Sequence, residues 1–229
     1  MFLRVWNMQN IINLQYQLDK VYMAVALSYI FAVDIFFYLG GFMLGYLFLK
    51  QYYRKRGWKM FLMAVLQRWL RLAPLFLMCM LIYWKVMPYL GSGPLYYQYK
   101  APVSYCATSW WKDLLFFGNF SENMCMVWGW YIQIDMQLFI ASLFLLWLYA
   151  EVNKKVFAGA TGAIMVAGII YCFVRCQTQD YHVIGNLDGA NNPNTDNYYL
   201  DLYNKPWSRT GPYLLGLLMG IYYYNYKER

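Results

Sequence analysis

The feature that most constrains this chain is a long apolar segment that ends at a strongly basic loop. Residues 21–49 are interrupted by one carboxylate, Asp34. As a helix this segment would be about 44 Å long, and roughly 20 residues are enough to cross the hydrocarbon core of a bilayer. Five basic residues and no acidic residue follow it: Lys50, Arg54, Lys55, Arg56 and Lys59. Because positive charge marks cytoplasmic loops, the pattern predicts a transmembrane helix that ends in the cytoplasm.

Four further apolar segments follow, each bounded by polar or charged residues. We predict spans at about 21–49, 60–87, 126–149, 156–174 and 211–226. Charged residues make up 13% of the chain, against about a quarter in soluble domains, which indicates lipid as the main solvent. Gly41-x-x-x-Gly45 would permit close approach of another helix, although membrane helices also tolerate glycine without such a contact. The prediction is an all-α, polytopic integral membrane protein with about five transmembrane helices, in one membrane domain at 21–229.

The basic residues also set the expected sides of the loops. They are densest beside the predicted cytoplasmic ends, which places the loops at 88–125 and 175–208 on the luminal or extracellular side of the plasma membrane or an endomembrane. Residues 1–20 then form a non-cytoplasmic lead-in, and we expect a further helix before it. The net charge of +8 comes from these basic runs, so we expect membrane lipids as partners and no nucleic acid.

The predicted outer loop at 88–125 carries two cysteines and a glycosylation sequon. Cys106 and Cys125 either form a disulfide, which an oxidising compartment favours, or remain two free thiols. Asn119-Phe120-Ser121 is an acceptor sequence for an N-linked glycan, usable only on the luminal side. Residues 110–120 are expected to form a short helix that lies in the membrane interface.

Two acidic residues lie inside predicted spans, where a charge is costly and often functional. Asp34 lies at middle depth of the first span. Asp135 shares one helical face with Trp128 and Tyr131, which precede it by seven and four residues. The two carboxylates either face one cavity, in which an arginine neutralises one of them, or hold helices together as a structural polar clamp.

Two arginines lie near the cytoplasmic end of the second predicted span. Arg68 and Arg71 are three residues apart, on one face of a helix. Such a pair binds the phosphates of a cofactor or a lipid, or else extends toward ordinary headgroups. The sequence holds no group of residues with metal-ligand spacing, so we expect no metal site.

Four motifs, in this order along the chain, resemble those of one enzyme family. Residues 33–42, VDIFFYLGGF, resemble the pattern VDxFFxLSGF, and residues 68–74, RWLRLAP, resemble RxxRLxP. Residues 203–213, YNKPWSRTGPY, match a KPxxRxGPY box, and the cysteines, tryptophans and DMQ triplet of residues 106–137 follow the expected order. Together they resemble the acyltransferase 3 family, in its nose-resistant-to-fluoxetine-like branch.

The resemblance implies a polytopic helical enzyme that takes an acyl group from acyl-CoA, its donor substrate. The acceptor would be a hydroxyl group of a lipid, a sugar or a glycan. By motif, Arg68 and Arg71 would contact the donor phosphates, and Asp34 and Asp135 would form the catalytic cavity. Three further residues would bind substrate, namely Arg209, Trp128 and Tyr131. For Arg209 the alternative role is an ion pair with one of the acids.

The chain departs from the family pattern in three ways. Gly40 stands where the family has serine, the family has more spans than are predicted here, and its catalytic arginine and histidine would precede Met1. We therefore expect a truncated form with a partial acyltransferase 3 fold, without the N-terminal catalytic helix and the C-terminal spans. The alternative is a non-catalytic membrane protein that binds or transports lipids or hydrophobic small molecules.

Overall fold

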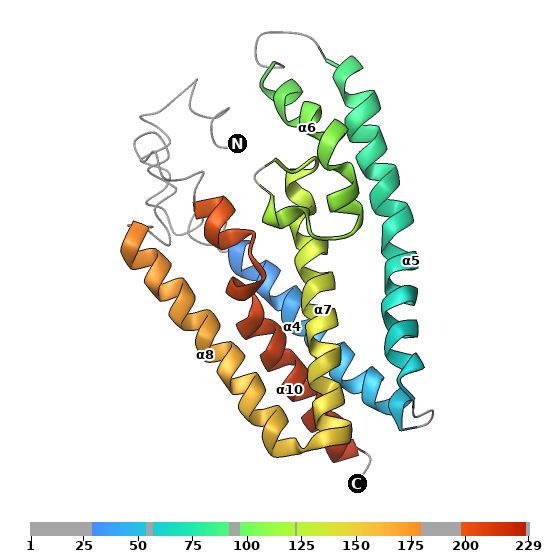
Figure 1. Cartoon of the computed structure of the whole chain (residues 1–229), viewed down its shortest axis with the longest axis vertical. Helices are drawn as coiled ribbons and strands as arrows, with labels where there is room; N and C mark the ends of the chain where they lie inside the picture. The colour runs from blue at the N-terminus through green and yellow to red at the C-terminus, as the bar shows by residue number, and fades with distance from the viewer. Residues whose placement is uncertain (1–28, 54–56, 92–96, 122, 180–197, 228–229) are drawn as a thin grey trace.

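The computed structural model describes residues 29–53, 57–91, 97–121, 123–179 and 198–227 as a bundle of long helices (Figure 1). The main helices are α4 (Tyr29–Tyr52), α5 (Lys59–Leu81), α6 (Tyr97–Leu114), α7 (Trp130–Trp147), α8 (Lys154–Gln179) and α10 (Thr210–Lys227). Every regular element in these ranges is helical, which confirms the all-α prediction. The predicted lead-in at 1–20, the start of the first span and residues 180–197 lie outside the described residues.

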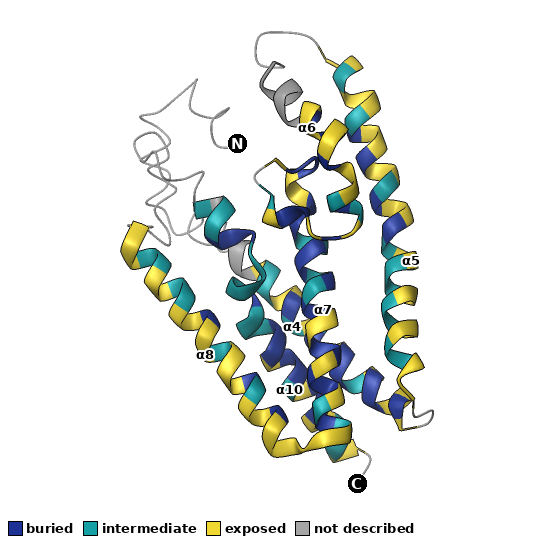
Figure 2. Cartoon of the chain, viewed as in Figure 1, coloured by how far each residue is buried: buried dark blue, intermediate teal, exposed yellow. Residues whose placement is uncertain are grey.

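Four helical stretches in the described ranges are long and apolar enough to cross a membrane, so the protein is polytopic. They are Ala32–Tyr52, Lys59–Tyr89, Val127–Val152 and Lys154–Gln179. The fifth predicted span is present as α10, but its tyrosines, Asn225 and Lys227 make it less apolar than those four. One face of α10 is buried against other helices, whereas α5 and α8 have broad exposed surfaces (Figure 2). A helix enclosed by its neighbours needs less lipid-compatible surface.

The interface between α4 and α10 brings two helix backbones into contact, and the two helices run in the same direction (Figure 1). A Cβ atom added to Gly41 would lie 2.1 Å from the carbonyl oxygen of Tyr213, and one added to Gly216 would lie 2.0 Å from a carbonyl oxygen of α4. Gly45 and Gly220, one turn further along, would place the same atom 2.7 and 2.3 Å from a facing carbonyl oxygen. Glycines four residues apart on both helices therefore permit this approach.

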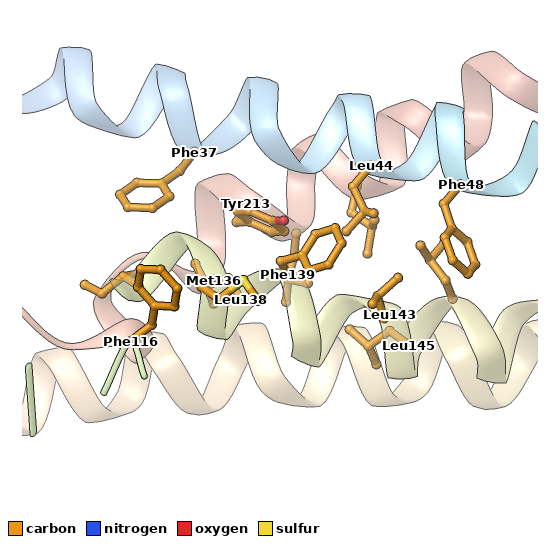
Figure 3. Packing of buried hydrophobic residues seen from close by; sticks show 14 of the residues in the cluster. Phe37, Leu44, Phe48, Phe116, Met136, Leu138, Phe139, Leu143, Leu145 and Tyr213 are labelled. Atoms are coloured by element: carbon orange, nitrogen blue, oxygen red, sulfur yellow. The ribbon is translucent and has the colours of Figure 1, made fainter. Parts of the chain in front are cut away.

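Helix α7 supplies much of the buried apolar surface of the core. Its side chains meet those of α4 and α10, and the ring of Tyr213 lies between α4 and α7 (Figure 3). Phe37, Tyr213 and Ile134 are completely buried. A smaller cluster around Met80 and Cys106 joins α5 to α6. The core thus holds α4, α7 and α10 together, and α5 and α8 pack on its outside (Figure 2).

The loop predicted at 88–125 contains a long helix in place of the short one expected at 110–120. Helix α6 begins at Tyr97, after the glycines and proline of residues 91–94, and ends at Leu114; Pro102 lies within its first two turns. The chain then turns at Phe116, which has a left-handed φ of 61°. Cys106 in α6 forms a disulfide with Cys125, just before α7. We call α6 together with residues 115–121 and 123–126 the cap, which covers one end of the bundle (Figure 1).

Candidate functional site

Two of the three arginine–aspartate pairs in the described residues unite residues that the sequence singles out. Arg68 of α5 pairs with Asp135 of α7, and Arg209, just before α10, pairs with Asp34 of α4. The sequence analysis offers a cavity in which one arginine neutralises one of two carboxylates. The structure instead gives each carboxylate its own arginine, because the fold brings a different basic motif beside each acid.

The Arg68–Asp135 pair lies well inside the bundle. Nη2 of Arg68 donates to Oδ2 of Asp135, and the two side chains are 19% and 17% exposed. The guanidinium also lies 4.2 Å from the ring centre of Phe139, a contact that favours a cation. Arg68 follows the first residue of α5 by nine positions, or about 14 Å of helix. It therefore lies two and a half turns into the helix, within the candidate span.

The Arg209–Asp34 pair joins the start of α10 to α4. Nη1 of Arg209 donates to Oδ1 of Asp34 at 2.8 Å. The Arg209 side chain is largely buried, and its guanidinium carbon lies 4.5 Å from the ring centre of Tyr203. An enclosed arginine in contact with an aromatic ring and a carboxylate is well suited to hold two helices in register.

The two pairs lie at different levels of the bundle. A Cβ atom added to Gly40 of α4 would be 3.6 Å from Oδ1 of Asp135 and equally far from Cε2 of Tyr213 of α10, so both helices reach Asp135 at these residues. Gly40 and Tyr213 follow Asp34 and Arg209 by six and four positions, which is about 6 to 9 Å of helix. Asp34 and Asp135 therefore belong to separate sites. Asp135 of α7 lies beside residues of α4 and α10 that come later in those helices than Asp34 and Arg209.

Two tyrosines complete the surroundings of the deeper pair. Tyr213 is completely buried, and its hydroxyl has no hydrogen-bond partner among the described residues; the same holds for Nε of Arg68. The ring of Tyr131 packs on Phe37, with ring centres 4.9 Å apart, and lies within electrostatic range of Asp135 and Arg68. We call Arg68, Tyr131, Asp135 and Tyr213 the Asp135 site. It combines a carboxylate, a guanidinium and two phenols in apolar surroundings.

Two residues predicted to bind substrate or donor lie apart from this pairing. Arg71 is exposed on α5, one turn after Arg68. Trp128 lies in a 3₁₀ turn before α7, is 57% exposed, and packs against Tyr83 with ring centres 5.1 Å apart. The helical spacing that relates Trp128 to Asp135 does not apply, because α7 begins at Trp130.

A second polar cluster, on the opposite face of α7, holds the cap against the bundle. Oδ2 of Asp113 accepts hydrogen bonds from the backbone N–H groups of Cys125 and Met126, at 3.0 and 3.3 Å. Its Oδ1 accepts from Nε2 of Gln133 at 2.9 Å, and Oε1 of Gln133 accepts from the backbone N–H of Asn119 at 2.6 Å. A Cβ atom at residue 118 would overlap the Asp113 carboxylate, so glycine is required there.

Gln137 and the segment before α10 extend this cluster. Nε2 of Gln137 donates to Oδ1 of Asn119 and to the carbonyl of Phe116, both at 2.7 Å. Nζ of Lys205 donates to the carbonyl of Asn119 at 2.7 Å. Nδ2 of Asn119 donates to the carbonyl of Asn204 at 3.1 Å. We call Asp113, Asn119, Gln133 and Gln137 the cap network, which ties α6, α7 and residues 204–205 together.

Burial changes the pKa values of two groups in this region. It raises the pKa of the Asp113 carboxyl, and the hydrogen bonds from Gln133 and two backbone N–H groups oppose the change. It lowers the pKa of the Lys205 amine, which the charge of Asp201 opposes. In both cases the loss of water outweighs the polar contacts that replace it.

The structure contains the predicted disulfide of the outer loop, but it buries the asparagine of the glycosylation sequon. The Cys106–Cys125 disulfide is formed. Asn119 is 2% exposed, and both atoms of its side-chain amide are hydrogen-bonded. An enzyme that attaches a glycan needs access to this amide, and the folded cap does not give it. The structure therefore provides Asn119 with a role in holding the cap.

The sequence analysis assigns no individual role to Asp113 or Tyr213. Asp113 follows Lys112 within the otherwise aromatic and apolar segment WWKDLLFF, and an acid in such a segment can serve as a buried acceptor. Tyr213 ends the KPxxRxGPY box one helical turn after Arg209, a spacing that places both on one side of α10. The local sequence thus marks both residues, but it does not identify their contacts, which come from distant segments of the chain.

Apolar helices that are long enough to cross a membrane enclose paired charges, which defines a polytopic membrane protein with an ionic site in its interior. In the described part of the chain, no group of three or more His, Cys, Asp or Glu residues could hold a metal ion. The family model for an acyltransferase domain matches residues 2–229. The chain therefore belongs to the acyltransferase 3 family, as its motifs indicate.

Two proteins of Caenorhabditis elegans are similar to this chain. Nose resistant to fluoxetine protein 6 is 26% identical over 212 residues, which cover 82% of this chain and 25% of that protein. Regulator of hypoxia-inducible factor 1 is 27% identical over 179 residues, which cover 71% of this chain and 34% of that protein. The chain thus corresponds to about a quarter to a third of these curated relatives. No solved structure matches it.

Proposed function

We propose that this chain forms part of an O-acyltransferase site, at which an acyl group passes from acyl-CoA to a hydroxyl group of a lipid, sugar or glycan. Membership of the acyltransferase 3 family supports acyl transfer as the type of reaction. The observation that carries the proposal is the Arg68–Asp135 pair, because it joins two family motifs inside the membrane-spanning bundle.

The proposed reaction is the attack of a hydroxyl oxygen on the carbonyl carbon of a thioester. A C–O bond forms, the C–S bond breaks, and the hydroxyl proton ends on the sulfur of the departing thiol. Asp135 would hold the acceptor hydroxyl by its proton, and Arg68 would orient the carboxylate and stabilise negative charge on the carbonyl oxygen. These charges act strongly because apolar surroundings screen them little.

The donor phosphates need a cationic contact outside the apolar core. Arg71 is exposed one turn from Arg68, and Lys59 is exposed at the start of the same helix. We assign Arg71 to the donor phosphates, since a guanidinium can bind phosphate through two parallel hydrogen bonds. Asp34 would act indirectly in this scheme, because its pair with Arg209 holds α4 and α10 in the register that places Gly40 beside Asp135.

We also propose that the cap faces the lumen or the cell exterior. The disulfide supports this side, because thiols outside the cytosol tend to oxidise. Cysteines at two exposed positions, Tyr89→Cys near the cap and Trp58→Cys at the start of α5, test it in sealed vesicles of known orientation, with the free cysteines Cys79, Cys172 and Cys176 replaced by alanine. An impermeant maleimide added to the luminal face should label Tyr89→Cys, and labelling of Trp58→Cys instead would reverse the orientation.

Acyl transfer is tested with the chain in lipid nanodiscs, radiolabelled oleoyl-CoA, and a fatty alcohol, a monoacylglycerol or a sugar as acceptor. We expect ester formation, and we expect Asp135→Asn to reduce it by about 100-fold or more, because this carboxylate contacts the reacting hydroxyl. Asp201→Asn is the matched control, since Asp201 also pairs with an arginine, Arg175, outside the Asp135 site. It should retain wild-type transfer.

Two results would contradict the proposal. One is the absence of ester formation and of oleoyl-CoA hydrolysis in the wild type, with equal lipid binding by wild type and Asp135→Asn. That result would favour a non-catalytic membrane protein that binds or transports lipids, in which both ion pairs serve to hold helices together. The other is an equal loss of transfer in Asp201→Asn and Asp135→Asn, which would indicate a general effect of breaking an ion pair.

A further inference from the structure

Gly40 differs from the other glycines of the α4–α10 interface. A Cβ atom at Gly41, Gly45, Gly216 or Gly220 would lie between 2.0 and 2.7 Å from a facing backbone oxygen. At Gly40 the same atom would make ordinary contacts at 3.6 Å, with Oδ1 of Asp135 and Cε2 of Tyr213. Helix packing therefore does not require glycine at this position, and there is room for a small group beside the Asp135 carboxylate.

The polar atoms around this position are only partly paired. The ion pair with Arg68 uses Oδ2 of Asp135, while Oδ1 faces position 40. Tyr213 is completely buried, and its hydroxyl finds no partner in the described part of the chain. Its ring extends between α4 and α7 (Figure 3). Because buried hydroxyl groups are almost always hydrogen-bonded, a partner from outside the described residues is expected here.

We propose that the hydroxyl group of a bound acceptor occupies the space beside Gly40. It accepts a hydrogen bond from the hydroxyl of Tyr213 and donates one to Oδ1 of Asp135. A hydroxyl is the simplest group that both donates and accepts, as these two neighbours require. The inference rests on the proposed function, since it identifies the ligand as the acceptor of the acyl group, and it makes Tyr213 a substrate-positioning residue.

The surroundings also indicate the chemical class of the acceptor. The aromatic side chains nearby, Phe37 and Phe139, are buried and apolar. A sugar brings several hydroxyl groups, and each one that loses water without finding a partner opposes binding. Asp135 lies eight residues after Val127, where the span begins, or about 12 Å along it. These features favour a hydrophobic alcohol, with one hydroxyl on an apolar body that dissolves in the bilayer.

The test uses the full chain in lipid nanodiscs and, as probe, a long-chain alcohol that carries a photoreactive diazirine. Irradiation should label peptides of α4, α7 or α10. Unlabelled 1-hexadecanol should compete with the probe, whereas hexadecane, which lacks the hydroxyl, and glucose should not. Tyr213→Phe removes the donor, and Gly40→Ser fills the space with a hydroxyl of the protein. Each should lower labelling by about five- to thirty-fold, the effect of one buried hydrogen bond.

Two matched variants control for the substitutions themselves. Tyr222→Phe changes an exposed tyrosine of the same helix, α10. Gly162→Ser changes a glycine of α8 where an added Cβ would meet nothing within 4 Å. Both should label as the wild type does. Circular dichroism and thermal unfolding establish that all four variants are folded, so that a loss of labelling reports the site.

Equal labelling of the wild type, Tyr213→Phe and Gly40→Ser overturns the inference, as does equal competition by hexadecane or glucose. Failure of the proposed function gives a different result. Labelling that depends on Tyr213 and Gly40, without ester formation from oleoyl-CoA and hexadecanol, supports the alcohol site and contradicts acyl transfer. Ester formation that Gly40→Ser leaves unchanged supports acyl transfer and overturns the alcohol site.

Discussion

Helix α7 carries a polar cluster on each of two opposite faces, and the two clusters are completed in different ways. On one face, Gln133 and Gln137 exchange hydrogen bonds with the cap. On the other face, Asp135 is paired with Arg68, yet Nε of Arg68 and the hydroxyl of Tyr213 have no partner in the described residues. Gln133 and Tyr213 are both completely buried, so burial does not distinguish the two clusters.

The Tyr213 hydroxyl marks this difference, because Nε lacks a partner in all three arginines that pair with an aspartate in the described residues, Arg68, Arg175 and Arg209. The cap network uses its donors and acceptors within the protein, which makes the cap rigid. The Asp135 site keeps buried polar atoms that have no partner among the described residues, an arrangement that opposes folding and that a bound ligand would relieve. Substitutions in the cap network should therefore reduce stability more than substitutions at the unpaired atoms of the Asp135 site.

Asp113→Ala should have the largest effect on stability. It leaves two backbone N–H groups and the amide of Gln133 without an acceptor in a buried place, so we expect a loss of about 3 to 5 kcal/mol in the free energy of unfolding. Unfolding in detergent, followed by circular dichroism, measures it. The control is Asp201→Ala, which breaks a more exposed ion pair and should cost about 1 kcal/mol or less. If the two variants lose similar amounts of unfolding free energy, the cap network does not have the structural role assigned to it.

Asp135→Leu should have the next largest effect, at about 3 kcal/mol, because it leaves the enclosed guanidinium of Arg68 without a counter-ion. The double variant Arg68→Met with Asp135→Leu removes both charges and should recover most of this loss. The coupling between the two positions is measured with a double-mutant cycle. If the double variant loses the sum of the two single losses, the pair is not the interaction that these residues make.

Gln133→Leu and Tyr213→Phe compare the two faces of α7 directly. Gln133→Leu leaves Asp113 and the N–H of Asn119 each short of one partner, which should cost about 2 kcal/mol. Tyr213→Phe removes a hydroxyl that has no partner in the described residues and should change stability by less than about 0.5 kcal/mol. Thermal unfolding without added ligand measures both. A larger loss for Tyr213→Phe would mean that the protein itself completes this site.

The stability of the cap should also depend on pH. Burial raises the pKa of Asp113, so the native protein holds this proton to a higher pH than the unfolded chain does. This contribution to stability is therefore present below the unfolded pKa and is lost as pH rises through the folded pKa. For one proton the slope is at most about 1.4 kcal/mol per pH unit. Asp113→Asn does not titrate, and an identical pH profile for that variant and the wild type would refute the assignment.

Helix α7 also shows which features of the site can be predicted from the sequence. Gln133, Asp135 and Gln137 alternate in one apolar span, and helical geometry places the two glutamines on one face and the aspartate on the opposite face. Helical periodicity does not predict which residues contact each face. Asp113 and Arg68 come from other helices, and which one meets which face depends on how the helices pack.

The helices are largely visible in the sequence, because long apolar runs are a local property, and four of them are long and apolar enough to cross a membrane. Helices α7 and α10 begin and end within a few residues of the predicted spans. The contact between α4 and α10 is partly visible, since Gly41-x-x-x-Gly45 and Gly216-x-x-x-Gly220 have the same spacing. Their pairing is a tertiary property, and so is the assignment of Arg68 to Asp135 and of Arg209 to Asp34.

The contact of α4 with α10 has a consequence for how the protein is made. Asp34 and its partner Arg209 are 175 positions apart. A ribosome that adds about 5 to 20 residues per second needs about 10 to 35 s to synthesise the chain between them. Until then α4 stands in the membrane with an uncovered glycine face and an unpaired carboxylate. Helix α10 therefore completes the contact that covers α4, and a nascent chain that stalls before Thr210 would present α4 to the proteases that clear incomplete membrane proteins.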